Sequence, residues 1–274
     1  MFRKILIPLD GSELSQRVLP PLRHMLDEDG VTSVVLARVT GPGEDEARAR
    51  EELERLVGLL VASGVPAQAR LAVGRDAGEE ILRLAGELEV DLVAMATHGR
   101  SGLLRLVRGS VAERVLRGCT RPLLLCNPRV LQREAPQEGF QRILVPLDGS
   151  ALAERVLEPA AALARIYDAE LVLFKVENFA TDQGRSALRP PAEVLATLEP
   201  LAARLRAQGL SRVSSRTALG SEVVEILEAI ERLDVDLLAL TTHGRSGVSR
   251  WWFGSVAEAL VRAATCPLFV LRVS

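Results

Sequence analysis

Two stretches of the sequence place glycine and serine where backbone amides could hold a phosphate group. They read THGRSGLLRLVRGSVAE from Thr97 and THGRSGVSRWWFGSVAE from Thr242. In each, a Gly-Ser pair precedes a segment of helical period that carries a Ser-x-x-Glu capping box. The first amides of such a helix lack intrahelical partners and lie at the positive end of the helix dipole, so this junction favours an anion. Glycine also lets the main chain approach an oxyanion closely and adopt a positive φ without steric cost.

The same pattern fits a plain turn before a capped helix, and the two interpretations stay open at this point. Two features favour phosphate binding: the twelve residues between strand and helix exceed what a simple connection needs, and they are rich in glycine and arginine. An arginine there either meets phosphate or stays solvated. The candidates in the first stretch are Gly99, Arg100, Gly102, Gly109, Ser110 and Val111, and those in the second are Gly244, Arg245, Gly254, Ser255 and Val256.

Two aspartates, Asp10 and Asp148, follow short apolar runs within the repeated motif PLDGS. A carboxylate at that place can accept hydrogen bonds from ribose hydroxyls or help to hold a phosphate-bound Mg²⁺. Alternatively, each aspartate only caps the turn with its Gly-Ser neighbours. We expect His98 and His243 to organise turns rather than catalyse, because the sequence shows no serine or cysteine nucleophile pattern and no partnered acid.

These residues belong to a unit that is written twice along the chain. KILIPLDGS at 4–12 recurs as RILVPLDGS at 142–150, and THGRSG and GSVAE recur in the same order, at offsets that grow from 138 to 145 residues. In each copy, short runs rich in Val, Ile and Leu alternate with segments of helical period, which predicts α/β domains with a parallel sheet covered by helices on both faces. In such a sheet ligands bind beyond the carboxyl ends of the strands.

The repeat predicts domains at 1–127 and 141–274, joined by a linker at 128–140 that has no apolar period and contains prolines. The predicted strands are 3–9, 32–39, 67–73, 91–97 and 122–127 in the first copy and 141–147, 169–176, 212–219, 236–242 and 267–272 in the second. The predicted helices of the first copy are 13–28, 44–63, 76–89 and 110–118. PLDGS then follows the first strand and THGRSG the fourth, so both motifs face one crevice if those strands are neighbours.

The composition excludes several classes of partner and points to a cytoplasmic protein. The net charge is −2, and the charges nearly cancel within each half, so we expect no nucleic acid and no anionic membrane as partner. No apolar run approaches the about 20 residues of a membrane span. Three cysteines without metal-ligand spacing predict buried, unreactive thiols.

The motifs resemble those of the universal stress protein family, in particular its members with two domains in one chain. The nucleotide-binding pattern of that family is Gly-x2-Gly-x9-Gly-Ser/Thr. Its second glycine, nine-residue gap and Gly-Ser pair match Gly99 to Ser110 and Gly244 to Ser255. The first glycine is replaced by Ala96 in one copy and by Thr241 in the other, so neither copy matches in full.

This resemblance implies Rossmann-like domains, each with a five-stranded, mainly parallel sheet in the order 3-2-1-4-5, that bind ATP with or without Mg²⁺. It places the aspartate of PLDGS on the ribose, the Gly-Ser amides on the phosphates, and the adenine at the end of the second strand. It also implies that the two domains pair through their last strands, and a further homodimer stays open. The residues so implied are Pro8, Leu9, Asp10, Val39, Met95 and Ala96 in the first copy and Pro146, Leu147, Asp148, Val176, Leu240 and Thr241 in the second.

The two copies are not equivalent. β-Branched Thr241 hinders a close backbone approach more than Ala96 does. Leu106-Val107-Arg108 in the first loop corresponds to Trp251-Trp252-Phe253 in the second. Arg108 adds positive charge near the phosphates. We therefore expect the first copy to be the better nucleotide site. The leading hypothesis is an ATP-binding stress or signalling protein, and the alternatives are a nucleotide-independent interaction module and, behind both, a slow ATPase that uses Asp10.

Overall fold

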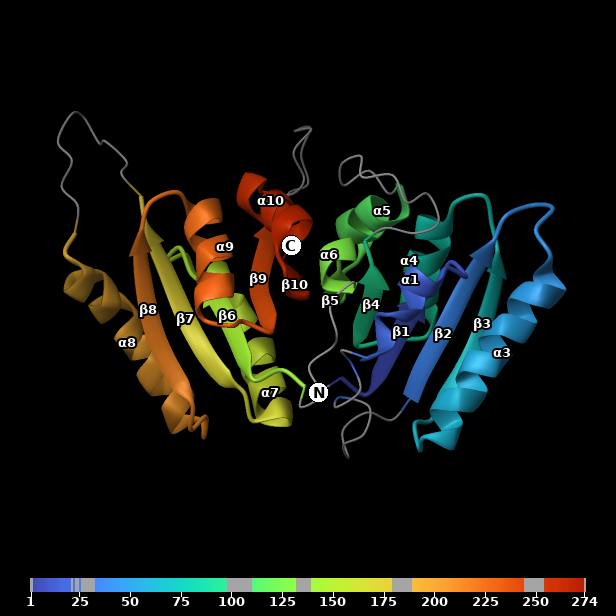
Figure 1. Cartoon of the computed structure of the whole chain (residues 1–274), viewed down its shortest axis with the longest axis horizontal. Coiled ribbons are helices and arrows are strands. Elements are labelled where there is room, and N and C mark those ends of the chain that lie inside the picture. The colour runs from blue at the N-terminus through green and yellow to red at the C-terminus, as the bar shows by residue number, and fades with distance from the viewer. Residues whose placement is uncertain are drawn as a thin grey trace. The chain divides into compact units, whose positions relative to one another are not determined.

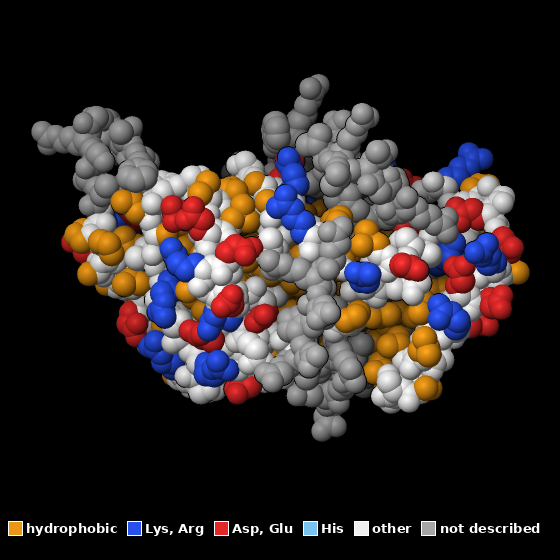
Figure 2. All heavy atoms as spheres, in the orientation of Figure 1, with side chains coloured by type: hydrophobic (Ala, Val, Ile, Leu, Met, Phe, Trp, Pro, Cys, Tyr) orange, Lys and Arg blue, Asp and Glu red, His pale blue; other side chains and the backbone are white. Residues whose placement is uncertain are grey.

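The chain divides into two compact units, Met1–Gly139 and Phe140–Ser274, and each is an α/β domain built on a parallel sheet (Figure 1). The structure is a computed structural model, which describes residues 2–20, 22, 25, 33–97, 110–131, 139–178, 189–243 and 254–273. Among these residues no helix is both long and apolar enough to cross a membrane. On the face shown in Figure 2, acidic and basic side chains are interspersed over the described surface.

The first unit follows the predicted alternation of strands and helices. Its elements are β1 (Lys4–Pro8), α1 (Glu13–Gln16), β2 (Ser33–Thr40), α3 (Glu46–Ala62), β3 (Ala67–Val73), α4 (Ala77–Glu87), β4 (Leu92–Ala96), α5 (Ser110–Gly118), β5 (Leu123–Cys126) and α6 (Pro128–Leu131). The strands lie in the order β3-β2-β1-β4-β5, and all four pairings are parallel. The central strand β1 is buried at Ile5, Leu6 and Ile7, because helices cover both faces of the sheet.

The second unit repeats this architecture. Its elements are β6 (Arg142–Pro146), the 3₁₀ helix η1 (Ala153–Val156), α7 (Leu157–Tyr167), β7 (Glu170–Glu177), α8 (Pro191–Ala207), β8 (Val213–Leu219), α9 (Glu222–Arg232), β9 (Leu237–His243), α10 (Ser255–Ala263) and β10 (Leu268–Val273). The strand order is β8-β7-β6-β9-β10, again all parallel. In both units the order along the sheet is 3-2-1-4-5, as predicted, and the sequence direction reverses beside the first strand.

One predicted helix is interrupted in the structure. The periodicity predicts a helix at 13–28, but α1 ends at Gln16 and a turn follows at Arg17 and Val18 before helical geometry resumes at 19–20. Pro20 explains the break, because it has no amide hydrogen to donate to the carbonyl of Gln16, four residues earlier. Most of the remaining segment, 21–32, lies outside the described residues.

A second difference lies at the start of the predicted linker, where residues 128–131 form the helical turn α6. The Asn127 Oδ1 accepts hydrogen bonds from the amides of Arg129 at 2.9 Å and Val130 at 3.1 Å, so it caps the turn. Val130 and Leu131 are buried, and the Arg17 guanidinium donates to the carbonyl of Leu131 at 2.9 Å. This part of the segment therefore packs against the first domain, and 132–138 lies outside the described residues.

The three cysteines, Cys119, Cys126 and Cys266, are buried and form no disulfide, which confirms the predicted burial. Burial raises the pKa of the Cys126 thiol to about 12, so the reactive thiolate is suppressed near neutral pH.

Candidate nucleotide site

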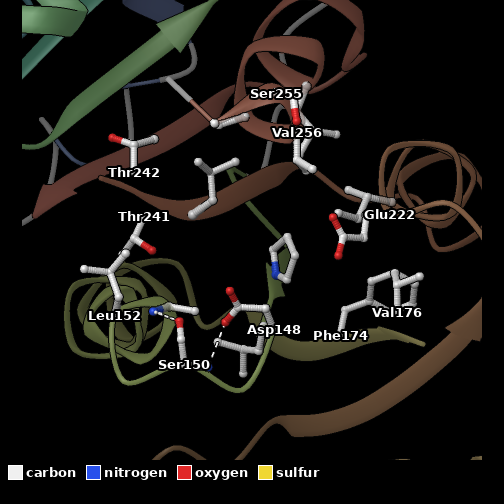
Figure 3. Close-up of a pocket in the computed structure, with 18 residues that line it drawn as sticks. Asp148, Ser150, Leu152, Phe174, Val176, Glu222, Thr241, Thr242, Ser255 and Val256 are labelled. Atoms are coloured by element: carbon white, nitrogen blue, oxygen red, sulfur yellow. Dashed lines mark hydrogen bonds between the residues drawn. The ribbon is translucent and has the colours of Figure 1, made fainter. Parts of the chain in front are cut away.

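A cavity of about 270 Å³ opens in the second domain at the carboxyl ends of β6, β7 and β9, between η1, α9 and α10 (Figure 3). Its apolar wall includes side chains from β7, α9, β9 and α10, and its polar groups come from the β6 turn, α9, β9 and α10. The lining residues are Pro146, Leu147, Asp148, Ser150, Leu152, Ala153, Phe174, Val176, Glu222, Ile226, Leu240, Thr241, Thr242, Gly254, Ser255, Val256, Ala257 and Leu260. The cavity thus occupies the switch point where an open α/β sheet binds its ligand.

The turn after β6 positions Asp148. Gly149 takes a φ of +91°, which favours glycine, and this conformation turns the chain from β6 toward η1. The Ser150 amide donates to the Asp148 Oδ1 at 2.8 Å, and the Ala153 amide donates to the Ser150 Oγ at 3.1 Å. Asp148 therefore organises the turn and also borders the cavity (Figure 3). The two roles are compatible because a carboxylate accepts several hydrogen bonds.

The first domain repeats this turn. Gly11 has a φ of +81°, and the Asp10 Oδ1 accepts from the Ser12 amide at 3.0 Å and from the Ser12 Oγ at 2.6 Å. The Ser12 Oγ in turn accepts from the Ser15 amide at 3.2 Å, which caps α1. The aspartates of PLDGS therefore cap the turn in both copies, and this role does not exclude a ligand role.

The main chain of β7 offers hydrogen-bonding groups to the cavity. The Leu147 amide donates to the Phe174 carbonyl at 2.8 Å, so the polar groups of Phe174 face β6. Alternate residues of a strand direct their N–H and C=O groups to the same side. Those of Val176 therefore face the same side as those of Phe174, but β6 ends at Pro146 and does not reach them. This leaves one donor and one acceptor at a wall of the cavity.

Another boundary of the cavity is the amino-terminal end of α10. The helix starts at Ser255, and its N-cap residue is Gly254, which has no side chain to cap the first turn. The capping box expected with serine as the N-cap is therefore wrong for this helix. A Cβ atom added at Gly254 would meet no atom within 4 Å. The sequence suggested two reasons for glycine in this loop, a positive φ and close approach of an oxyanion. The φ of Gly254 is −55°, so the first reason is wrong at this position. What remains is close approach to the first amides of α10, where an anion is favoured.

The structure brings together most of the residues that the sequence predicted for the second domain. Nine of them line the cavity: Pro146, Leu147, Asp148, Val176, Leu240, Thr241, Gly254, Ser255 and Val256. The other two, Gly244 and Arg245, lie outside the described residues, as does the Trp-Trp-Phe segment. Thr241 stands where the family pattern has glycine, yet the cavity is open beside it (Figure 3). The side chain of His243 is not described.

In the first domain, the described candidates lie at the same edge of the sheet. Pro8 ends β1 and is followed by Leu9 and Asp10, Val39 lies near the end of β2, Met95 and Ala96 end β4, and Val111 follows Ser110 in α5. Because β1 pairs with both β2 and β4, the strand ends that carry these residues are neighbours. Gly99, Arg100, Gly102 and Gly109, with His98 and Arg108, lie outside the described residues. The expectation that the first copy is the better site therefore stays a prediction.

Among the wall residues that were not predicted from the sequence, Phe174 and Glu222 contribute an aromatic ring and a charge. Phe174 lies two residues before Val176 on the same face of β7, so the two-residue period of a strand would have found it. Strand register shows that its counterpart is Ala37, since Pro146 pairs with Phe174 and Pro8 with Ala37. Glu222 is the first residue of α9, and α4 begins with Ala77 instead, so the repeat gave no signal there.

The charge on the cavity wall is negative. Asp148 and Glu222 are the charged side chains among the residues that line it. A cation lies close to the turn, since the Lys175 Nζ is 3.1 Å from the position that a Cβ on Gly149 would take. A wall with two carboxylates and an apolar floor suits a ligand with an apolar ring and several hydrogen-bond donors. The amides at the start of α10 carry partial positive charge, so they suit an anion.

Comparison with known proteins assigns the chain to a family. The sequence profile of the universal stress protein family matches residues 1–127 and 139–272. The chain belongs to the universal stress protein family. It carries two copies of the family domain, so it is a tandem universal stress protein.

Relatives of this universal stress protein match one copy or both. A universal stress protein of Methanocaldococcus jannaschii is 26% identical over 147 residues, which cover 48% of this chain and 82% of the relative. A putative universal stress protein of Staphylococcus haemolyticus is 30% identical over 146 residues, 48% of this chain and 85% of the relative. The crystal structure of a universal stress protein from Archaeoglobus fulgidus superimposes on 99% of this chain over 99% of its own length. The TM-score is 0.78 and the sequence identity is 23%. That structure shares the fold of the whole chain.

Proposed function

We propose that this universal stress protein is a cytoplasmic stress-response protein that binds ATP at the carboxyl edge of each sheet. The observation that carries the proposal is the cavity bounded by Asp148, the end of β7 and the start of α10. These are the places at which the family resemblance implies ribose, adenine and phosphate. A volume of about 270 Å³ lies just under the range of about 300–1,000 Å³ for ligand pockets, so it accommodates a nucleoside whose phosphates extend toward α10.

Each part of ATP finds groups of the right chemistry. The apolar side chains of Phe174, Val176 and Leu240 suit the face of a purine, and the main chain of Val176 offers a donor and an acceptor for its edge. The Asp148 carboxylate accepts from ribose hydroxyls. The amides at the start of α10 attract the phosphates.

Magnesium would be held through the phosphates and not by a cage of protein ligands. Among the described residues, no group of three or more His, Cys, Asp or Glu side chains could hold a metal ion. Mg²⁺ commonly binds through phosphates and one or two carboxylates, and Asp148 is the carboxylate at the end of β6. The proposal is one of binding, without a catalytic step.

The test is calorimetric titration of the whole chain with ATP, together with native mass spectrometry of gently purified protein. Asp148→Asn keeps an acceptor for the Ser150 amide and removes the charge, so the turn persists while ribose binding weakens. We expect the affinity of the second site to fall by about 10- to 100-fold, as loss of a hydrogen bond to a charged acceptor predicts. Asp10→Asn tests the first site in the same way.

The matched control is Asp168→Asn in the same domain. Asp168 is exposed at the end of α7 with a φ of +48°, a conformation that asparagine also adopts readily. This variant should bind ATP as the wild type does. Absence of adenine nucleotide on the purified protein, together with no heat of binding at millimolar ATP, would refute the proposal and favour a nucleotide-independent interaction module.

A further inference from the structure

Glu222 is a half-buried carboxylate in the wall of the cavity, outside every motif that the repeat contains. It is the first residue of α9, and Figure 3 shows its side chain reaching from that helix toward the cavity. Its Oε1 accepts a hydrogen bond from the Asn178 Nδ2 at 3.0 Å. Asn178 directly follows β7, two residues after Val176, so this bond ties Glu222 to the end of β7.

This position separates the roles of the two carboxylates in the cavity. Asp148 follows β6, where the ribose is expected, whereas Glu222 lies by the end of β7, where Val176 and Phe174 form the wall for the base. The base is therefore the part of the ligand that Glu222 can reach. A carboxylate only accepts hydrogen bonds, so its partner on the base must be a donor.

Purine bases differ in this respect at carbon 6. Adenine carries an amino group there, which is a donor, whereas hypoxanthine and guanine carry a carbonyl, which is an acceptor. We propose that Glu222 accepts a hydrogen bond from the 6-amino group and makes the second domain select adenine over 6-oxo purines, an inference that rests on the nucleotide site proposed above. A carbonyl in that place would face a carboxylate without a proton between them, and both groups would lose hydration.

The first domain lacks this device. Its α4 begins with Ala77 behind the N-cap Asp76, whose Oδ1 accepts from the Glu79 amide at 3.0 Å. The side chain at the first helical position is therefore a methyl group in one domain and a carboxylate in the other. We expect stronger discrimination between purines in the second domain than in the first.

A purely structural role for Glu222 is the plain alternative, because an acid in the first turn of a helix interacts favourably with the helix dipole. Glu225 supplies the matched control. It lies in the same first turn and carries the same charge, but its carboxylate lies beside Gly220 and is absent from the cavity wall. If the dipole alone matters, Glu222→Gln and Glu225→Gln behave alike.

The experiment compares ATP with inosine triphosphate, which differs at carbon 6 by a carbonyl in place of the amino group. Both are titrated calorimetrically into the whole chain in an Asp10→Asn background, so that the second domain dominates the signal. We expect the parent to prefer ATP and Glu222→Gln to lower the ratio of the two affinities by about tenfold, because the amide of glutamine can donate to the carbonyl. Glu222→Ala should also lower the ratio, and Glu225→Gln should leave it unchanged.

The outcomes separate this inference from the function on which it rests. If the parent binds ATP and Glu222→Gln keeps the same ratio, the selective role is wrong while nucleotide binding stands. If the parent binds guanosine triphosphate as tightly as ATP, the assignment of the 6-amino group is wrong. If neither the parent nor the wild type binds ATP, the proposed function fails and this inference fails with it. Thermal unfolding followed by circular dichroism verifies that each variant is folded.

Discussion

In each domain an aspartate connects the first and fourth strands at their amino-terminal ends, opposite the candidate site. Removal of this carboxylate gives a quantitative prediction. The Asp236 Oδ2 accepts hydrogen bonds from the amides of Gln141 and Arg142, both at 2.9 Å, and the Asp236 amide donates to the Arg142 carbonyl at 3.0 Å. Asp236 immediately precedes β9 and Arg142 opens β6. It thus aligns the two strands whose far ends carry Asp148 and the loop to α10.

The expected cost of Asp236→Ala follows from these contacts. Two hydrogen bonds from backbone amides to a charged acceptor are lost, each with a net contribution of about 1.5 kcal/mol, the lower end of the range for a charged acceptor. Burial of the carboxylate offsets part of this, since burial raises the pKa of Asp236 above its usual value of 3.8. We expect the free energy of unfolding of the second domain to fall by about 2 kcal/mol, and ATP binding there to weaken as the strand ends lose their alignment.

Hydrogen exchange followed by mass spectrometry is the assay, because peptides from β6 and β1 report on the two domains separately. The first domain has the same device, in which the Asp91 Oδ2 accepts from the amides of Arg3 at 2.8 Å and Lys4 at 2.9 Å. Asp236→Ala should speed exchange in β6 peptides and leave β1 peptides unchanged, and Asp91→Ala should do the reverse. A loss of protection under about 0.5 kcal/mol in β6 would refute the reasoning.

The pH dependence of the same group has a definite sign. Because the pKa of Asp236 is raised mainly by burial, the folded state binds this proton more tightly than the unfolded state does. Its protonation therefore stabilises the fold below the ordinary pKa of 3.8, and that contribution is lost as the pH rises through the higher pKa of the folded state. The wild type should lose stability relative to Asp236→Asn over this window, and a gain would contradict the assignment.

Three further variants or treatments test other features. Gly254→Ala should leave thermal stability unchanged, because the φ is −55° and the added Cβ meets no atom within 4 Å, but should weaken ATP binding in calorimetry; equal affinity would argue against close approach of phosphate. Asn127→Ala should lower the free energy of unfolding of the first domain by about 1 kcal/mol through loss of the α6 cap, measured by urea titration, and no change would mean that the cap is dispensable. Cys126, whose thiol has a pKa of about 12, should resist iodoacetamide at pH 8 in the native protein and react in urea, as peptide mass spectrometry would show; equal rates would contradict its burial.

The fold was predictable from sequence because its signals are repeated and local. Apolar runs mark the buried strands, and the duplicated PLDGS and THGRSG motifs identify the first and fourth strands, which the structure places side by side. The helix at 13–28 was predicted as continuous because its apolar period outweighed the missing amide of Pro20, and the structure interrupts it at Arg17 and Val18. The helical turn after Asn127 was missed because a cap on four residues leaves no periodic pattern.

The site was predictable where its residues lie in duplicated motifs and unpredictable where they do not. Asp148 and Ser255 were found through the repeat, and Thr241 through the family pattern. Phe174 and Glu222 were missed because their counterparts are alanines, so comparison of the copies gives no signal for them. Their place in the wall depends on which strands and helices converge, and that is a property of the folded sheet.

The position of Val176 beyond the end of β6 has a consequence for how such a site changes during evolution. The groups that face the cavity there belong to the peptide backbone and exist with any side chain except proline at this position. Hydrogen bonds from a ligand to these backbone groups do not depend on the side chain, so the surrounding residues can change while the ligand is still bound. The two domains, which differ at Ala37 and Phe174 and at Ala77 and Glu222, have that freedom to specialise in separate ligands or separate concentration ranges.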